Sequence, residues 1–207
     1  MQFLFVAMQF LTDFADLAVV LPLAVAVGVA LLASGWPRGA LAWAVVVPAT
    51  LLTVLLAKLV VAACGTYLPF HGLYDGFRSP SGHTASAAVV YGGLLSLLLP
   101  EPRRGLSRPF AAIAIAGVVA VLFGGTRLAL HVHSRSDVLA GAALGIAGAL
   151  VLARFAGPRP SRLRVAIPLA VALAVVLLFH GRHLRAEDQI DRVSHLVWPL
   201  TLCCRAR

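Results

Sequence analysis

Six long stretches of this sequence contain no Asp, Glu, Lys or Arg. They cover residues 17–37, 39–57, 84–100, 109–126, 138–153 and 165–181. Each is close to the length that an α-helix needs to cross the roughly 30 Å hydrocarbon core of a bilayer. A helical protein folded in water would need polar faces on its outer helices, and these stretches have almost none. The sequence therefore predicts an all-α fold, a polytopic membrane bundle of six transmembrane helices.

The first 16 residues form a further segment that is too short to cross. Gln2, Gln9, Asp13 and Asp16 fall on one helical face, which predicts a helix lying in the membrane interface before the first span. The N-terminus lacks the basic stretch that begins a cleavable signal peptide, so the first apolar stretch is expected to remain as a span. We treat residues 1–207 as a single integral-membrane domain.

The net charge of +9 comes from 16 arginines and one lysine against eight acidic residues. The arginines lie mainly in the short connections rather than in one patch, so nucleic-acid binding is not expected. With six spans, the arginine-rich first, third and fifth connections share one side, which the positive-inside rule places in the cytoplasm. The second and fourth connections then face outward. We expect a bacterial inner (plasma) membrane protein with these connections in the periplasm; the arginine-rich tail mildly favours the opposite orientation.

Two groups of polar residues interrupt the apolar pattern on that outer side. The first is Pro80-Ser81-Gly82-His83, where the third predicted span begins. Backbone N–H groups at a helix start, together with the helix dipole, form a site for an anion. Gly82 allows a phosphate to approach the backbone closely. Arg127 follows the fourth stretch and can add two parallel hydrogen bonds to phosphate oxygens.

The second group continues from Arg127 to His133 and Asp137, which are four residues apart. On one face of a helical turn, the carboxylate would hold the imidazole in one tautomer and stabilise its cationic form. An imidazole held in this way is a nucleophile for phosphorus. His83 would then protonate the departing oxygen and afterwards activate water. His131 has the wrong spacing for this role, and we interpret it as a loop or helix-face histidine.

Together these residues resemble the type 2 phosphatidic acid phosphatases, or lipid phosphate phosphatases, a family that shares its site with the vanadium haloperoxidases. The second motif of that family is Pro-Ser-Gly-His. Its third is Ser-Arg, five residues, His, three residues and Asp, and this chain has Thr126 in place of the Ser. The resemblance covers about residues 58–137, the motif core.

The resemblance implies a role for each matched residue. His133 would form a phosphohistidine, with Asp137 as its orienting partner and His83 as the general acid. The phosphate would be bound by Ser81, Gly82 and Arg127.

The first motif of the family, Lys, six residues and then Arg-Pro, is not intact here. Counting from Lys58, the only lysine, the Arg-Pro positions hold Gly65 and Thr66. Lys58 lies about 9 Å of helix rise below Cys64, where an unpaired charge costs about 2.5 to 3.5 kcal/mol unless it snorkels or pairs. We interpret Lys58 as a phosphate ligand, with snorkelling as the alternative. Arg78 either replaces the missing arginine or contacts a lipid headgroup.

We predict an integral-membrane phosphatase that acts on a lipid phosphate or diphosphate, such as a polyprenyl diphosphate, phosphatidate, phosphatidylglycerol phosphate or lipid A. No Asp/Glu cluster or Cys/His set suits a metal, so we expect metal-independent hydrolysis and no cofactor. A phosphotransferase with the same site, in which an alcohol replaces water, is the alternative. A transporter is less favoured because only Lys58 places a charge inside a span. The expected partners are the lipid substrate and membrane lipids, and no oligomeric state is indicated.

Overall fold

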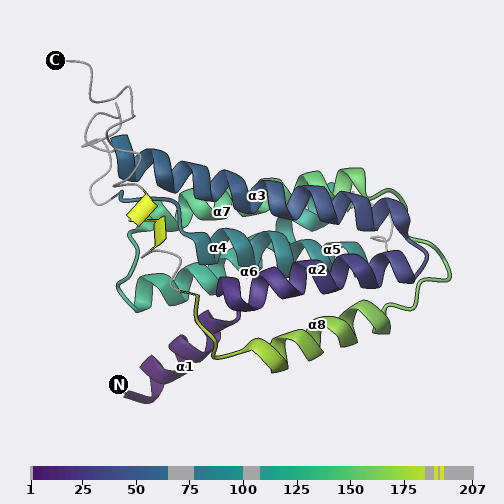
Figure 1. Cartoon of the computed structure of the whole chain (residues 1–207), viewed down its shortest axis with the longest axis horizontal. Helices are drawn as coiled ribbons and strands as arrows, with labels where there is room; N and C mark the ends of the chain where they lie inside the picture. The colour runs from purple at the N-terminus through teal and green to yellow at the C-terminus, as the bar shows by residue number, and fades with distance from the viewer. Residues whose placement is uncertain (1, 65–76, 100–107, 185–188, 191, 194–207) are drawn as a thin grey trace.

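A computed structural model describes residues 2–64, 77–99, 108–184, 189–190 and 192–193. Its labelled elements are all helices: α1 (Gln2–Asp13), α2 (Leu17–Ala33), α3 (Pro37–Cys64), α4 (Gly82–Ala87), the π-helical turn η2 (Ala88–Gly92), α5 (Gly93–Leu98), α6 (Arg108–Ala129), α7 (Arg135–Phe155) and α8 (Ala166–Phe179). Because α4, η2 and α5 follow one another directly, they form one helical segment. Six apolar segments therefore follow α1 and pack lengthwise as a bundle (Figure 1).

The six predicted helices of the bundle are confirmed as these six segments. Four helices are long and apolar enough to cross a membrane: α3, α6, α7 and the stretch Phe3–Ala33, which takes in α1 from its second residue and all of α2. The segment Gly82–Leu98 and α8 are apolar but shorter. The 14 residues of α8 rise only about 21 Å. α3 runs past the predicted end at residue 57, because a single lysine ends a charge-free stretch without ending a helix.

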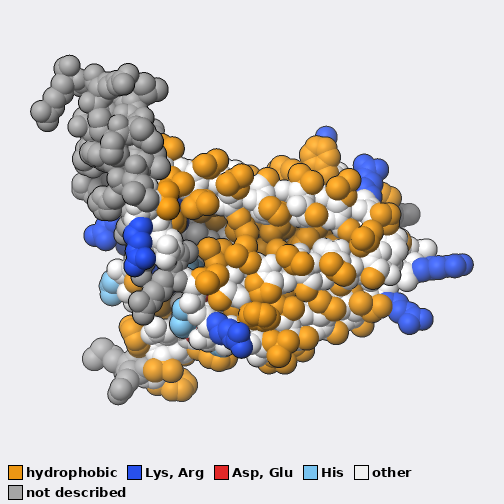
Figure 2. Space-filling model, viewed as in Figure 1, with side chains coloured by type: hydrophobic (Ala, Val, Ile, Leu, Met, Phe, Trp, Pro, Cys, Tyr) orange, Lys and Arg blue, Asp and Glu red, His pale blue; other side chains and the backbone are white. Residues whose placement is uncertain are grey.

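The sides of the bundle are apolar. Large hydrophobic side chains stand out from several helices, including Val25 (69% exposed), Val121 (77%) and Leu177 (73%). Figure 2 shows hydrophobic side chains covering the visible flank, with Lys and Arg toward the two ends. Such a surface is expected for helices surrounded by lipid, and it agrees with the predicted polytopic membrane bundle.

α1 is a separate helix, as predicted, and its position in the membrane interface remains a prediction. The chain turns at residues 14–16, and Asp16 then caps α2 by accepting a hydrogen bond from the N–H of Ala18 at 2.8 Å. In Figure 1, α1 departs from the bundle at an angle, at the end where α3 finishes and α4 starts.

Three glycines let α7 approach its neighbours closely. A Cβ on Gly141 would overlap the backbone carbonyl of Ser81, and a Cβ on Gly145 would meet a carbonyl of α4. A Cβ on Gly148 would collide with the side chain of Thr50 on α3. Small residues permit this kind of contact between membrane helices. The start of α4 is therefore held against the first turns of α7.

Candidate active site

Four helix termini meet at one end of the bundle. α3 ends there at Cys64, α4 begins at Gly82, α6 ends at Ala129 and α7 begins at Arg135 (Figure 1). α4 packs against α3, α6 and α7, so residues at these termini share one region. All the predicted site residues belong to this end: Lys58, Arg78, Ser81, Gly82, His83, Arg127, His133 and Asp137.

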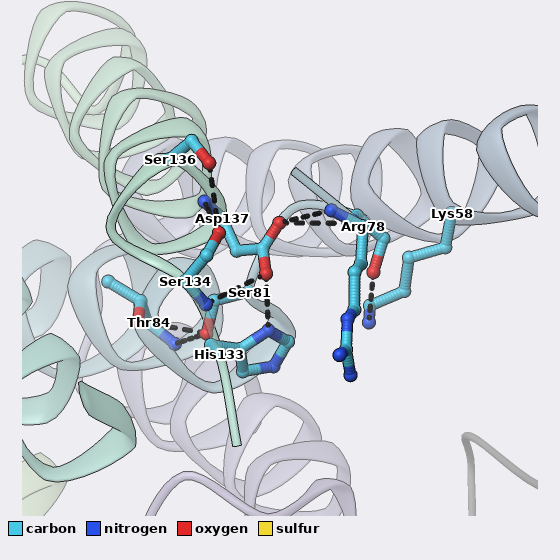
Figure 3. A network of polar contacts seen from close by, with 9 residues as sticks. Lys58, Arg78, Ser81, Thr84, His133, Ser134, Ser136 and Asp137 are labelled. Atoms are coloured by element: carbon cyan, nitrogen blue, oxygen red, sulfur yellow. Dashed lines mark hydrogen bonds and ion pairs between the residues drawn. The ribbon is translucent and has the colours of Figure 1, made fainter. Parts of the chain in front are cut away.

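Asp137 joins the loop before α4 to the start of α7 (Figure 3). Its Oδ1 accepts hydrogen bonds from the backbone N–H groups of Arg78 (2.9 Å) and Ser79 (3.0 Å). Its Oδ2 accepts one from the N–H of Ser134 (3.0 Å) and lies 3.3 Å from Nδ1 of His133. The side chain has no exposed surface. Four N–H donors therefore replace the water that an ionised carboxylate otherwise needs.

A capping box determines where α7 begins. The hydroxyl of Ser134 accepts from the N–H of Asp137 at 3.2 Å, and the carboxylate of Asp137 accepts from the N–H of Ser134. Ser is a preferred helix cap and starts α7 at Arg135. The prediction that His133 and Asp137 share one helical turn is therefore wrong, because His133 precedes the cap. The predicted contact between them is confirmed, and the capping loop makes it.

The hydrogen bond to Asp137 fixes the tautomer of His133. A carboxylate only accepts, so Nδ1 carries the proton and Nε2 keeps its lone pair. Burial lowers the pKa of His133 below its ordinary 6.5, the hydrogen bond to Asp137 opposes this, and the charges of Arg127 and Lys58 lower the pKa further. At neutral pH the imidazole is therefore uncharged, with Nε2 available to attack an electrophile.

Lys58 keeps its amine at the site. The residue is 5% exposed, and Nζ donates to the hydroxyl of Ser79 at 3.4 Å. A Cβ on Gly82 would lie 3.6 Å from Cε of Lys58, so the lysine stem passes beside the glycine. Arg78 is exposed. Figure 3 shows the side chains of Arg78 and Lys58 extending toward the part of the view where the His133 ring lies.

α4 begins at Gly82 because Ser81 caps it. The Ser81 hydroxyl accepts from the N–H and the hydroxyl of Thr84, at 3.5 and 3.0 Å. The N–H of Ser81 donates to the carbonyl of Asp137 at 2.9 Å. With its oxygen directed to Thr84, the buried hydroxyl has only its proton to offer a phosphate. The N–H groups of Gly82 and His83 lie in the first turn, where a helix has no acceptor for them.

His83 and Arg127 complete the set. His83 follows Gly82 in the first turn of α4, at the same end of the bundle as Arg127 and Lys58. Arg127 lies in the last turn of α6, and its Nη1 donates to the hydroxyl of Thr12 at 3.5 Å. Sequence reasoning missed Thr12, which is 115 residues away from Arg127. It also missed the cap Ser134, although Ser-x-x-Asp before an apolar stretch is a recognisable signal.

His131 ends α6. Its φ of 56° is left-handed, its N–H donates to the carbonyl of Leu128 (3.0 Å), and the N–H of Val132 donates to the carbonyl of Arg127 (3.2 Å). This pair of bonds is a Schellman motif. The interpretation of His131 as a loop residue is confirmed, and the turn that it makes directs the chain toward His133.

The assembled groups suit transfer of a phosphoryl group. They comprise one neutral imidazole with an orienting carboxylate, a second imidazole, three cationic side chains and the N–H groups of a helix start. Positive groups and N–H donors fixed in place stabilise the charge that develops on phosphoryl oxygens. Among the residues that the structure describes, no three His, Cys, Asp or Glu side chains are grouped to hold a metal ion.

Comparison with known proteins gives three findings. The sequence model of the PAP2 superfamily matches residues 3–161, which include all the predicted site residues. An uncharacterized 22.5 kDa protein in the cps region of Klebsiella pneumoniae is 32% identical over 200 residues, 93% of this chain and 92% of that protein. Phosphatidylglycerophosphatase B of Bacillus subtilis (strain 168) is 42% identical over 71 residues, 34% of each chain. No solved structure matches.

Proposed function

The chain belongs to the PAP2 superfamily, and we propose that it is an integral-membrane phosphatase that hydrolyses a lipid phosphate or diphosphate through a phosphohistidine. The observation that carries the proposal is the pair of His133 and Asp137, whose 3.3 Å contact leaves Nε2 with its lone pair. Lys58, Arg78 and Arg127 belong to the same end of the bundle and supply positive charge. Hydrolysis is therefore proposed to need no metal ion.

The first step forms a bond between Nε2 of His133 and phosphorus while the bond from phosphorus to the leaving oxygen breaks. His83 gives a proton to that oxygen. The three cations and the N–H groups of Gly82 and His83 stabilise the oxygens of the transferring group. In the second step His83 takes a proton from water, the water oxygen attacks phosphorus, and the bond to Nε2 breaks. Phosphate leaves and both imidazoles return to their starting forms.

The substrate class rests on the apolar surroundings and on the relatives. A site at the end of a membrane bundle is reached most directly by a phosphate attached to a lipid. The Bacillus subtilis relative is named phosphatidylglycerophosphatase B and matches over a third of its length, so phosphatidylglycerol phosphate heads the list of substrates to test. Phosphatidate, polyprenyl diphosphates and lipid A follow.

Phosphate release by the purified protein in detergent tests the proposal. The expected result is release from at least one lipid phosphate, unchanged by EDTA and inhibited by vanadate, which adopts the five-coordinate geometry of the transferring group. His133→Ala should abolish release. His131→Gly is the matched control, because glycine adopts the left-handed conformation of residue 131 without strain. Strict dependence on magnesium or zinc, or near-normal turnover by His133→Ala, contradicts the mechanism.

We also propose that the site faces the periplasm and that the protein resides in a bacterial inner membrane. The support is the concentration of arginines in the connections at the opposite end. In a chain whose three native cysteines are replaced, a cysteine at the exposed Val132 should react with an impermeant reagent added to whole cells with a permeable outer membrane. A cysteine at the exposed Arg162 should react only after the inner membrane is opened. The reverse pattern would place the site in the cytoplasm.

A further inference from the structure

The turn between α1 and α2, residues 14–16, is buried against the helices that carry the site. The carbonyl of Phe14 accepts from the hydroxyl of Tyr91 at 2.6 Å, and the carbonyl of Ala15 accepts from the hydroxyl of Ser86 at 3.2 Å. Ser86 also lies 3.2 Å from the carbonyl of His83, on the same helix. The N-terminal segment therefore docks one turn away from the predicted general acid.

Thr12, just before this turn, reaches the phosphate-binding end of α6. It is 6% exposed, and its hydroxyl lies 3.1 Å from the hydroxyl of Thr126 and 3.5 Å from Nη1 of Arg127. Thr126 is itself 3% exposed and donates its proton to the carbonyl of Phe123 at 2.7 Å. Two hydroxyl groups and one guanidinium group, from α1 and from the last turn of α6, thus form one hydrogen-bonded chain.

The donors and acceptors in this chain have one consistent direction. A hydroxyl has one proton, and that of Thr126 is already given to Phe123. The proton of Thr12 must therefore go to Thr126, and the oxygen of Thr12 is left to accept from Arg127. Arginine cannot accept a hydrogen bond, so the reverse direction is excluded. The hydroxyl of Thr12 thereby restricts a long side chain that otherwise has many rotamers.

From this geometry we infer that Thr12 is a positioning residue for Arg127, and that the N-terminal helix is part of the phosphate site. The inference rests on the proposed function, in which Arg127 binds the transferring phosphoryl group. Thr12 acts through Arg127 and does not touch the substrate. A fork of guanidinium N–H groups contributes fully only when it is held in register with the phosphate oxygens.

Three single variants separate positioning from packing. Thr12→Val keeps the shape and removes the hydroxyl, and Thr12→Ser keeps the hydroxyl. Thr53→Val is the matched control, because the hydroxyl of Thr53 is exposed and bonds only within α3, to Ala49 at 2.8 Å. Thr12→Val should lower kcat on a short soluble phosphate ester and raise the vanadate inhibition constant, each on the order of tenfold. Thr12→Ser should restore both to within about threefold, and Thr53→Val should leave them unchanged.

Double variants test whether Thr12 works through Arg127. In an Arg127→Ala background, Thr12→Val should cause no further loss, because the group that it positions is already absent. If the activity losses of Thr12→Val and Arg127→Ala add in the double variant, Thr12 affects only the fold and the inference is wrong. The same follows if Thr12→Ser loses as much activity as Thr12→Val. Thermal unfolding in detergent is measured for each variant. If wild type neither binds vanadate nor releases phosphate, the proposed function fails and takes this inference with it; if wild type is active and Thr12→Val equals it, the inference alone fails.

Discussion

Asp137→Asn tests whether the buried carboxylate fixes the tautomer of His133. An amide has one acceptor oxygen and one NH2 donor, whereas Asp137 receives four N–H groups through two oxygens. If the amide oxygen keeps its bonds to Arg78 and Ser79, the NH2 group faces Nδ1 of His133. That arrangement favours the tautomer with the proton on Nε2. If the amide turns around, the loop before α4 loses its acceptor instead.

The expected loss of activity is larger than the expected loss of stability. A wrong tautomer removes the lone pair of the proposed nucleophile, and orienting carboxylates of this kind are worth up to about 10⁴-fold in kcat. We expect a fall of about 10² to 10⁴-fold. Setting an NH2 group against the N–H of Ser134 leaves one buried donor unpaired, which costs about 1 to 3 kcal/mol in the free energy of unfolding. A domain of ordinary stability, about 5 to 15 kcal/mol, remains folded after that loss.

Phosphate release and thermal unfolding, measured on the same detergent preparation, distinguish the two effects. Asp137→Asn added to His133→Ala should not lower the residual release further, since no imidazole is then left to orient. A single Asp137→Asn enzyme within about tenfold of wild type would refute the tautomer argument. So would a loss of activity that simply follows the fraction of unfolded protein.

Gly141→Ala should lower the free energy of unfolding by about 1 to 3 kcal/mol and lower activity, because the added methyl overlaps backbone at the start of α4. Gly117→Ala is the control: a Cβ there meets nothing within 4 Å outside its own stretch of helix, so stability should be unchanged or slightly higher. Equal losses of stability in the two variants would contradict this argument. Neutral His133 is the active form in the proposed mechanism, so kcat/KM should fall as pH drops through its lowered pKa. Lys58→Gln removes a charge that lowers this pKa and should move the acidic limb of the kcat/KM profile to higher pH. An acidic limb at an unchanged pH would contradict the assignment of this limb to His133. Arg78→Ala should slow release from a soluble ester about 10² to 10³-fold, partly restored by Arg78→Lys; a loss below about threefold would indicate a headgroup contact.

The spans were predictable because lipid imposes a simple rule on sequence. Every helix in contact with the bilayer must be apolar along its length, so charge-free stretches mark helices directly. The rule fails where a charge is accommodated inside the protein. Lys58 ends a stretch in the sequence, yet α3 continues because its amine reaches Ser79 at 3.4 Å.

Side-chain direction at the site was less predictable than residue identity. His133 and Asp137 make the expected contact, but through a capping loop set by Ser134. The hydroxyl of Ser81 accepts from Thr84 as the cap of α4, and its predicted contact with a phosphate stays a prediction. The role that we infer for Thr12 depends on its contacts with Thr126 and Arg127, which are 114 and 115 residues away in the sequence. No local sequence pattern contains such contacts.

The position of the donors to Asp137 bears on how the protein is made. An acidic side chain entering an apolar environment costs several kcal/mol until it finds hydrogen-bond donors. The N–H groups of Arg78 and Ser79 belong to a loop synthesised before α7, since chains emerge from the N-terminus. When α7 enters the membrane, the two N–H groups that donate to its carboxylate have already been synthesised. In a circularly permuted chain that began with α6, α7 would be inserted before this loop is synthesised, and the yield of folded protein should fall.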